Sequence, residues 1–317
     1  MVKKMNYMTK DKPYNSLNNY YKKIYNSKVA KISLNANFTC PNKDGTKGFG
    51  GCIYCSKLGS GDFAGDKNDS LAKQFNDIKT IIEKKWPNTL YIPYLQANSN
   101  TYAPLERLKK IYEEVLTIDH DKTVGLAIAT RPDCLSEDIC KYLAQLNQRV
   151  HISVELGLQT ANENTAKYIN RGLTNEEFIN GVKLLRKYNL EVIVHIINGL
   201  PNETIEDMLN TINFINNLDI QGIKFHCLLV LKNTKLYEQY KEKPFKILTL
   251  QEYVDITTKQ ITHLRSDIII HRLQADANIK DLVEPKWSTK KLVVMNEIDK
   301  KLRNDNDYQG KYYRDTN

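Results

Sequence analysis

Three cysteines, Cys40, Cys52 and Cys55, lie close together in the stretch CPNKDGTKGFGGCIYC. The residues between them include several glycines, which allow the backbone to adopt positive φ angles and to pass close to a bulky ligand. Lysine and aspartate keep the stretch polar, which is typical of a loop and not of a core element. This spacing therefore predicts a flexible loop that gathers three thiols around a metal group.

Two kinds of metal group suit such a loop. Structural zinc takes four tetrahedral ligands, and here the fourth would have to come from Cys134, Cys140 or a distant histidine, since the first histidine is His120. Iron–sulfur clusters also favour thiolate ligands, and three thiolates would leave one iron with an open coordination position. A small zinc loop and three unrelated buried cysteines remain alternatives. A disulfide is not expected, because nothing else indicates secretion.

By its length the chain could form one large α/β barrel domain or two smaller domains. The chain has 317 residues, and 41% of them are hydrophobic, which is enough for a sizeable core. No apolar run approaches the roughly 18 residues needed to span a membrane, so no membrane association is expected. The N-terminus MVKKMNYMTK lacks the apolar segment of a secretory signal. We therefore expect a cytoplasmic protein with reduced thiols.

The first thirty residues are unusually basic. They hold seven lysines, Lys22 and Lys23 among them, against one acid, which gives +6 of the net charge of +9. Five tyrosines lie between these lysines. Cations interleaved with aromatic rings suit a polynucleotide, whose phosphates bind lysines and whose bases stack on rings. The alternative is a solvated lysine face whose tyrosines pack on the rest of the protein.

Strands and helices alternate along the remainder of the chain, which predicts the α/β class with a parallel sheet. Expected strands cover 29–34, 89–96, 123–130, 150–160, 190–198 and 222–231, with a further probable strand at 268–273. In such folds the catalytic groups follow the carboxyl ends of the strands, and polar residues cluster there in this sequence. We divide the chain into a basic, tyrosine-rich extension (1–28), a barrel (29–244) and a C-terminal extension packed on the barrel (245–317).

Cys40 and the run Cys52-Ile53-Tyr54-Cys55 resemble the cysteine signature of radical S-adenosylmethionine (radical SAM) enzymes. Eleven residues separate the first two cysteines, a widened spacing that resembles the branch of the elongator catalytic subunit, and the whole stretch is similar to the YhcC/YtqA group of bacterial radical SAM proteins. This resemblance implies a partial (β/α)6 TIM-like barrel. It also implies that the three cysteines ligate a [4Fe–4S] cluster, with S-adenosylmethionine on the fourth iron, and that reduction cleaves this cofactor to a 5′-deoxyadenosyl radical.

The resemblance also implies roles for residues that follow the predicted strands. VELGLQT and HIINGLPNET are similar to segments that contact S-adenosylmethionine in these branches, and QANSNT occupies the position of another such motif. The implied cofactor-binding residues are Tyr54, Gln96, Asn98, Thr101, Glu155, Gln159, Arg171, Asn198 and Gly199. An ion pair between Glu155 and Arg171 is the structural alternative. HRLQADA resembles a signature of the YhcC/YtqA group and makes His271, Arg272 and Asp276 candidates for the substrate side. The basic N-terminal segment adds Lys22 and Lys23 as candidates for substrate binding.

Cys134, in the segment TRPDC, is the candidate catalytic residue, because a cysteine at the mouth of a barrel could donate a hydrogen atom to a substrate radical. It could equally be a small buried apolar residue. The resemblance and the basic N-terminus favour tRNA as the substrate, with remodelling of the carbon-5 side chain of the wobble uridine, and an electron donor such as flavodoxin or ferredoxin. The alternatives are a radical SAM enzyme acting on a small metabolite and a zinc-stabilised, non-catalytic RNA-binding protein.

Overall fold

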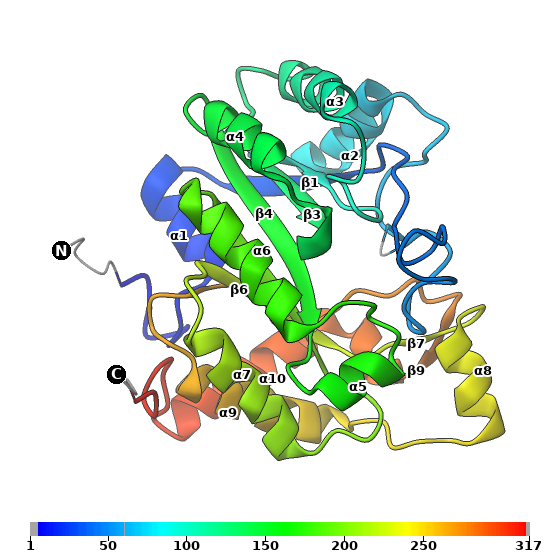
Figure 1. Ribbon diagram of the computed structural model, residues 1–317. Helices are drawn as coiled ribbons and strands as arrows, with labels where there is room; N and C mark the ends of the chain where they lie inside the picture. The colour runs from blue at the N-terminus through cyan, green and yellow to red at the C-terminus, as the bar shows by residue number, and fades with distance from the viewer. Residues whose placement is uncertain (1–5, 60, 315–317) are drawn as a thin grey trace.

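The protein is described by a computed structural model that covers residues 6–59 and 61–314. A curled sheet of parallel strands forms its centre, in the order β1-β2-β3-β4-β5-β6-β8 (Figure 1). These strands are β1 (Val29–Leu34), β2 (Leu90–Leu95), β3 (Gly125–Thr130), β4 (His151–Gln159), β5 (Glu191–Asn198), β6 (Gly222–Cys227) and β8 (Ile269–Arg272). A small antiparallel sheet joins β7 (Val230–Leu231) to β9 (Leu282–Glu284).

Helices connect the strands. They are α1 (Leu17–Tyr25), α2 (Leu71–Lys85), α3 (Leu105–Thr117), α4 (Glu137–Leu146), α5 (Glu163–Tyr168), α6 (Asn175–Lys187), α7 (Ile205–Asn216), α8 (Lys235–Glu242), α9 (Leu250–His263) and α10 (Lys291–Asn304), with short 3-10 turns at Pro132–Cys134 and Lys286–Thr289. Side-chain caps fix where several of them begin. Thr174 and Glu177 form a capping box at the start of α6, and Thr204 and Asp207 form another at α7.

The expected α/β half-barrel is confirmed. Strands that are neighbours along the chain are neighbours in the sheet as far as β6, as alternating βαβ units require. Ile128, Val154 and Val194 on the central strands are fully buried, because helices cover the outer face of the sheet. The predicted strand near residue 270 forms as β8 and pairs in parallel with β6, so the region after residue 244 contributes a strand to the main sheet.

The N-terminal helix α1 packs against the amino ends of the strands. Tyr21 is buried beside Val29 and Tyr94, and the Tyr25 hydroxyl donates a hydrogen bond to the carbonyl of Val124, which precedes β3. Tyr14 is buried too and donates to Asp299 on α10 at 2.9 Å. The tyrosines of the basic segment therefore pack largely against the rest of the protein, as in the alternative given above, and do not form a surface for base stacking.

All strands of the main sheet are parallel, so their carboxyl ends meet at one edge. The long cysteine loop after β1 lies at this edge, on the right in Figure 1, whereas α1 lies at the left. Among the described residues, no helix is both long and apolar enough to cross a membrane.

Candidate functional site

The cysteine loop is folded by its own backbone. The amide of Lys43 donates to the carbonyl of Cys40, and the amide of Cys55 donates to that of Cys52. Gly50 has a φ of +75°, a backbone conformation that residues with a side chain rarely adopt, so glycine is favoured at this turn of the loop. The three cysteines are half-buried residues, form no disulfide and line one cavity of about 270 Å³.

The environment of Cys52 favours its thiolate. A hydrogen bond from Cys55 is the main cause that lowers the pKa of Cys52, to about 6, against the effect of burial. Tyr54 and Arg131 act in the same direction, and the Asn42 amide donates to the sulfur at 3.8 Å. The thiolate is the form of cysteine that binds metals, so this thiol is prepared for ligation at neutral pH.

The three thiols suit an iron–sulfur cluster by their chemistry. Cys40, Cys52 and Cys55 line the same cavity, and a hydrogen bond from Cys55 favours the thiolate of Cys52. A [4Fe–4S] cluster takes thiolate ligands, each of which binds a different iron. The donor set of Cys40, Cys52 and Cys55 therefore fits the cluster.

Several predicted cofactor residues do meet the cysteines in this cavity. Tyr54, Gln96, Asn98 and Gln159 line it, together with Arg131 at the end of β3. The side chain of Asn98 is held from both sides, since it accepts from Lys43 at 3.2 Å and donates to the carbonyl of Phe38 at 3.0 Å. The carboxyl ends of β1 to β4 thus supply one continuous polar wall.

Other predicted residues do not line the cavity. Thr101 is buried and donates to the carbonyl of Cys134 at 2.8 Å, and Asn198 donates to Gln260 on α9 at 2.7 Å. Gly199, with a φ of +84°, turns the chain beside Leu248. These three residues lie at or just after the carboxyl ends of β2 and β5 and do not face the cavity.

Cys134 is buried beside the cavity and is not one of its lining residues. Burial is the main cause that raises the pKa of its thiol to about 12, so the sulfur stays protonated. Lys22 and Lys23, the predicted substrate ligands, are exposed in the last turn of α1, at the amino ends of the strands. The structure does not bring these three residues to the cavity.

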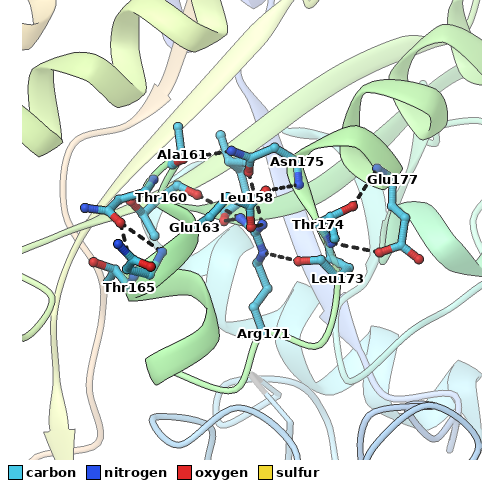
Figure 2. Close-up of polar contacts among 12 residues, drawn as sticks. Leu158, Thr160, Ala161, Glu163, Thr165, Arg171, Leu173, Thr174, Asn175 and Glu177 are labelled. Carbon is cyan, nitrogen blue, oxygen red and sulfur yellow. Dashed lines mark hydrogen bonds and ion pairs between the residues drawn. The ribbon is translucent and has the colours of Figure 1, made fainter.

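Arg171 lines the cavity but uses its guanidinium within the protein (Figure 2). The side chain is 1% exposed and donates to the carbonyls of Leu158, Thr160 and Leu173 at 2.8–2.9 Å. It also reaches Asn175 at 3.0 Å. Arg171 therefore ties the end of β4 to the turn before α6, and the alternative ion pair with Glu155 does not form.

Glu155 instead forms the centre of a charged group on the inner face of the sheet. Its carboxylate accepts from Lys31 at 2.5 Å and from Lys224, and it hydrogen-bonds to His195 at 2.7 Å. Burial alone would raise the pKa of Glu155, but Lys224 and Lys31 outweigh it and hold the pKa well below its usual range. The carboxylate is therefore ionised and already has three partners.

The partners of Glu155 come from β1, β5 and β6, and Tyr94 on β2 lies beneath both lysines. Lys224 is 4.6 Å from the centre of the Tyr94 ring, and Lys31 is 5.2 Å from it. Burial lowers the pKa of Lys224 to about 7, although Glu155 acts to raise it. Burial likewise lowers the pKa of His195 to about 4, and the neutral His195 ring stacks on His226 at 5.2 Å.

Sequence reasoning did not find Lys31, Tyr94 or Lys224. The available signal was a lysine in the middle of an otherwise apolar strand, as in VAKISL and GIKFHC, because a lysine is rarely buried without a partner. Arg272, which was predicted, lines the same cavity, whereas His271 is not one of its lining residues. Arg272 lies 3.4 Å from Asp276, which also pairs with Lys291 at 2.9 Å.

The rim beside the cysteine loop carries exposed aromatic and basic side chains. Phe49 is 78% exposed and Phe63 is 50% exposed, although both are large apolar residues. Lys57 in the same loop and Lys235 at the start of α8 are exposed as well. Exposed aromatic rings beside lysines are suited to stack on bases and to pair with phosphates.

Two family descriptions match the chain. Residues 45–215 match the Radical SAM superfamily, and residues 220–304 match the Radical_SAM C-terminal domain. The first match begins inside the cysteine loop and ends in α7, so it contains most of the cavity wall.

Three known proteins illustrate the similarity. Uncharacterized protein YtqA of Bacillus subtilis is 43% identical over 308 residues, which cover 97% of this chain and 95% of YtqA. The tRNA uridine(34) acetyltransferase of Methanocaldococcus infernus is 30% identical over 182 residues, which cover 56% of this chain and 33% of that protein. The solved structure of Methanocaldococcus infernus Elp3 superposes with a TM-score of 0.65 at 21% identity, over 87% of this chain and 63% of that one.

Proposed function

We propose that this protein is a tRNA-modifying enzyme. The chain belongs to the elongator-like branch of the radical SAM superfamily, whose enzymes use a [4Fe–4S] cluster and S-adenosylmethionine. The finer proposal is that it remodels the carbon-5 side chain of the wobble uridine. The zinc-stabilised, non-catalytic alternative is disfavoured by the family.

In this proposal Cys40, Cys52 and Cys55 hold the cluster. Tyr54, Gln96, Asn98 and Gln159 stand where S-adenosylmethionine would be held. When bound, the reduced cluster supplies the electron for cleavage of S-adenosylmethionine. The residues of this chain position the reactants, and the cavity keeps water and stray hydrogen donors away. Radical SAM enzymes need an electron donor, and we propose flavodoxin or ferredoxin for this role.

The rim of the cavity is the observation that carries the tRNA proposal. Phe63 lines the cavity and is half exposed, and Phe49 in the cysteine loop is more exposed still, so both rings are available for base stacking. Lys57 in the same loop and Lys235, whose Nζ lies beside Gly50 of that loop, offer charges for phosphates. A nucleotide bound there could insert its base toward the cysteines. Uridine 34 is proposed as the target because 56% of this chain is similar to a protein named tRNA uridine(34) acetyltransferase.

A cytoplasmic location is part of the same proposal. The six cysteines all lie within the described residues and form no disulfide there, which suits a reducing compartment. tRNA and the reduced electron donor would both be available there.

The test is an anaerobic reaction with tRNA. The cluster-loaded protein is incubated with dithionite, S-adenosylmethionine and total tRNA from cells that lack the gene, and the nucleosides are then analysed by mass spectrometry. The proposal predicts that one modified uridine changes mass, and that the change requires S-adenosylmethionine.

Two variants serve as matched controls. Cys52→Ser should abolish both S-adenosylmethionine cleavage and the nucleoside change. The combined Phe49→Ala and Lys235→Ala variant should keep cleavage and lose tRNA turnover. Cleavage without any nucleoside change in the wild-type protein would contradict the tRNA proposal and would favour a small-metabolite substrate.

A further inference from the structure

The charged group on the inner face of the half-barrel has more positive than negative charge. Lys31 and Lys224 both pair with the single carboxylate of Glu155, and Arg272 and Lys291 both pair with the single carboxylate of Asp276. Around Glu155 this leaves one buried and one half-buried lysine for one carboxylate, because the neighbouring histidines are held neutral, whereas Arg272, Asp276 and Lys291 are partly exposed. Burying an excess cation is costly unless an anion accompanies it.

The excess charge faces the cavity. Lys224 and Arg272 both line it, and so does His226. Lys224 is 5% exposed and has further N–H donors besides the one given to Glu155. Arg272 presents a planar guanidinium, which can bind two oxygens of one acid group. We call Lys224, Arg272 and His226 the cationic floor.

A second observation indicates a missing ligand at the cationic floor. The Nε2 atom of His226 is buried and has no hydrogen-bond partner among the described residues. A buried ring nitrogen without a partner has given up its hydrogen bonds to water and gained none in return. The atom belongs to a side chain that lines the cavity, so a polar atom of a bound ligand could satisfy it.

We propose that the cationic floor binds a carboxylate of the substrate. One carboxylate matches the excess cation beside Glu155, whereas the phosphates of a nucleic acid would remain at the rim. For the identity of the substrate this inference rests on the proposed function, in which a carbon-5 side chain that ends in a carboxymethylamino group would reach the cationic floor. The presence of an anion site does not depend on that identity.

Binding should also be linked to a proton. The groups that face Lys224 are Lys31, Tyr94, Glu155, His195, His226, His271 and Arg272. The pKa of Lys224 lies near 7 in the free protein, so part of the population is neutral at pH 7. A bound carboxylate would raise this pKa, so binding should take up a proton, and the affinity should fall as the pH rises above 7.

The test uses two small ligands that differ by one carboxylate. N-benzylglycine carries a ring, a secondary amine and a carboxylate, and N-methylbenzylamine lacks only the carboxylate. Their affinities for the full-length, cluster-loaded protein are measured anaerobically by calorimetry at pH 7. Wild-type protein should bind N-benzylglycine about ten-fold more tightly or better, as expected for a charge-assisted hydrogen bond.

Three variants locate the preference. Lys224→Met and Arg272→Gln should each lose most of it, and iron content checks that each variant is folded. Lys232→Met removes an exposed lysine that follows β7 and does not line the cavity, and this variant should keep the preference. Equal binding of the two ligands, no binding of N-benzylglycine, or a preference retained in both floor variants would overturn the inference.

The outcome is separable from that of the proposed function. A carboxylate preference with no tRNA binding would leave the anion site intact and overturn only the tRNA proposal. tRNA turnover without a carboxylate preference would do the reverse.

Discussion

Glu155→Gln is the substitution that most directly tests the electrostatics of the inner face. The wild-type carboxylate compensates Lys31 and Lys224 and hydrogen-bonds to His195. Glutamine keeps the shape and one oxygen acceptor but removes the negative charge. Without that charge, Lys224 stays buried beside Lys31 and Arg272, so its pKa should fall well below 7.

The loss of stability should therefore depend on pH. In the wild-type protein the pKa of Lys224 is about 7 and in the unfolded chain it is near 10.5. Below pH 7 Lys224 is protonated in both the folded and the unfolded wild-type protein, so it adds no pH dependence to the wild-type free energy of unfolding there. In the variant the folded state has lost the proton and the unfolded state keeps it, so variant stability falls by about 1.4 kcal/mol for each pH unit below 7.

The magnitudes follow from this difference. At pH 8 the variant should be destabilised by about 1.5–3 kcal/mol, the range for one charge-assisted hydrogen bond. At pH 5.5 the loss should grow by about 2 kcal/mol. With an unfolding entropy of about 2.1 cal/mol/K per residue, this increment corresponds to about 3 °C in melting temperature for a chain of 317 residues. His195, whose pKa is about 4, stays neutral throughout this range.

The assay is thermal unfolding of cluster-loaded wild type and variant at pH 5.5, 7 and 8, with equal iron content in both. Glu113→Gln is the control, since Glu113 forms an exposed pair with Arg149, and such pairs contribute at most about 1 kcal/mol. A Glu155→Gln loss that is constant with pH, or that shrinks as the pH falls, would refute the placement of Lys224 beside Glu155.

Three further predictions concern other parts of the site. Arg171→Met should lower the free energy of unfolding, measured in urea, by about 3–5 kcal/mol, because buried carbonyls lose their hydrogen-bond donor. The control Arg149→Met should lower it by less than about 1 kcal/mol. Similar losses in the two variants would contradict a structural role for the buried guanidinium. Cys134→Ala should leave S-adenosylmethionine cleavage and substrate turnover unchanged, since its protonated thiol does not line the cavity; loss of turnover with cleavage retained would restore it as a hydrogen donor. Replacing Lys57 and Lys235 by alanine should weaken tRNA binding and reduce the slope of log binding constant against log salt concentration by about 0.7–0.9 per lost contact. Replacing Lys22 and Lys23 should change neither the affinity nor the slope. The reverse pattern would place the RNA-binding surface on α1.

The sequence allowed the architecture and one side of the site to be predicted. Apolar runs such as TVGLAIAT identify buried strands, and the spacing of Cys40, Cys52 and Cys55 identifies the metal loop. Both patterns involve residues that are close together in the chain, so they can be recognised without knowledge of the fold.

The inner face of the sheet could not be predicted in the same way. Lys31, Glu155 and Lys224 lie on three strands far apart in the chain, and only the closure of the sheet brings them together. The tyrosines of the N-terminus were ambiguous for a related reason, since Tyr14 finds its partner Asp299 in the last helix. Thr101 follows β2 and Asn198 is the last residue of β5, but the direction of each side chain depends on tertiary packing.

The central claim is that Cys40, Cys52 and Cys55 hold an open-site cluster at the mouth of this cavity. The most direct measurement is the EPR spectrum of the anaerobically reconstituted, reduced protein, recorded with and without S-adenosylmethionine. The account predicts a [4Fe–4S]⁺ signal that shifts when S-adenosylmethionine is added, disappears in Cys52→Ala and persists in Cys134→Ala. A protein that binds stoichiometric zinc without sulfide, or a cluster signal that survives in Cys52→Ala, would contradict it.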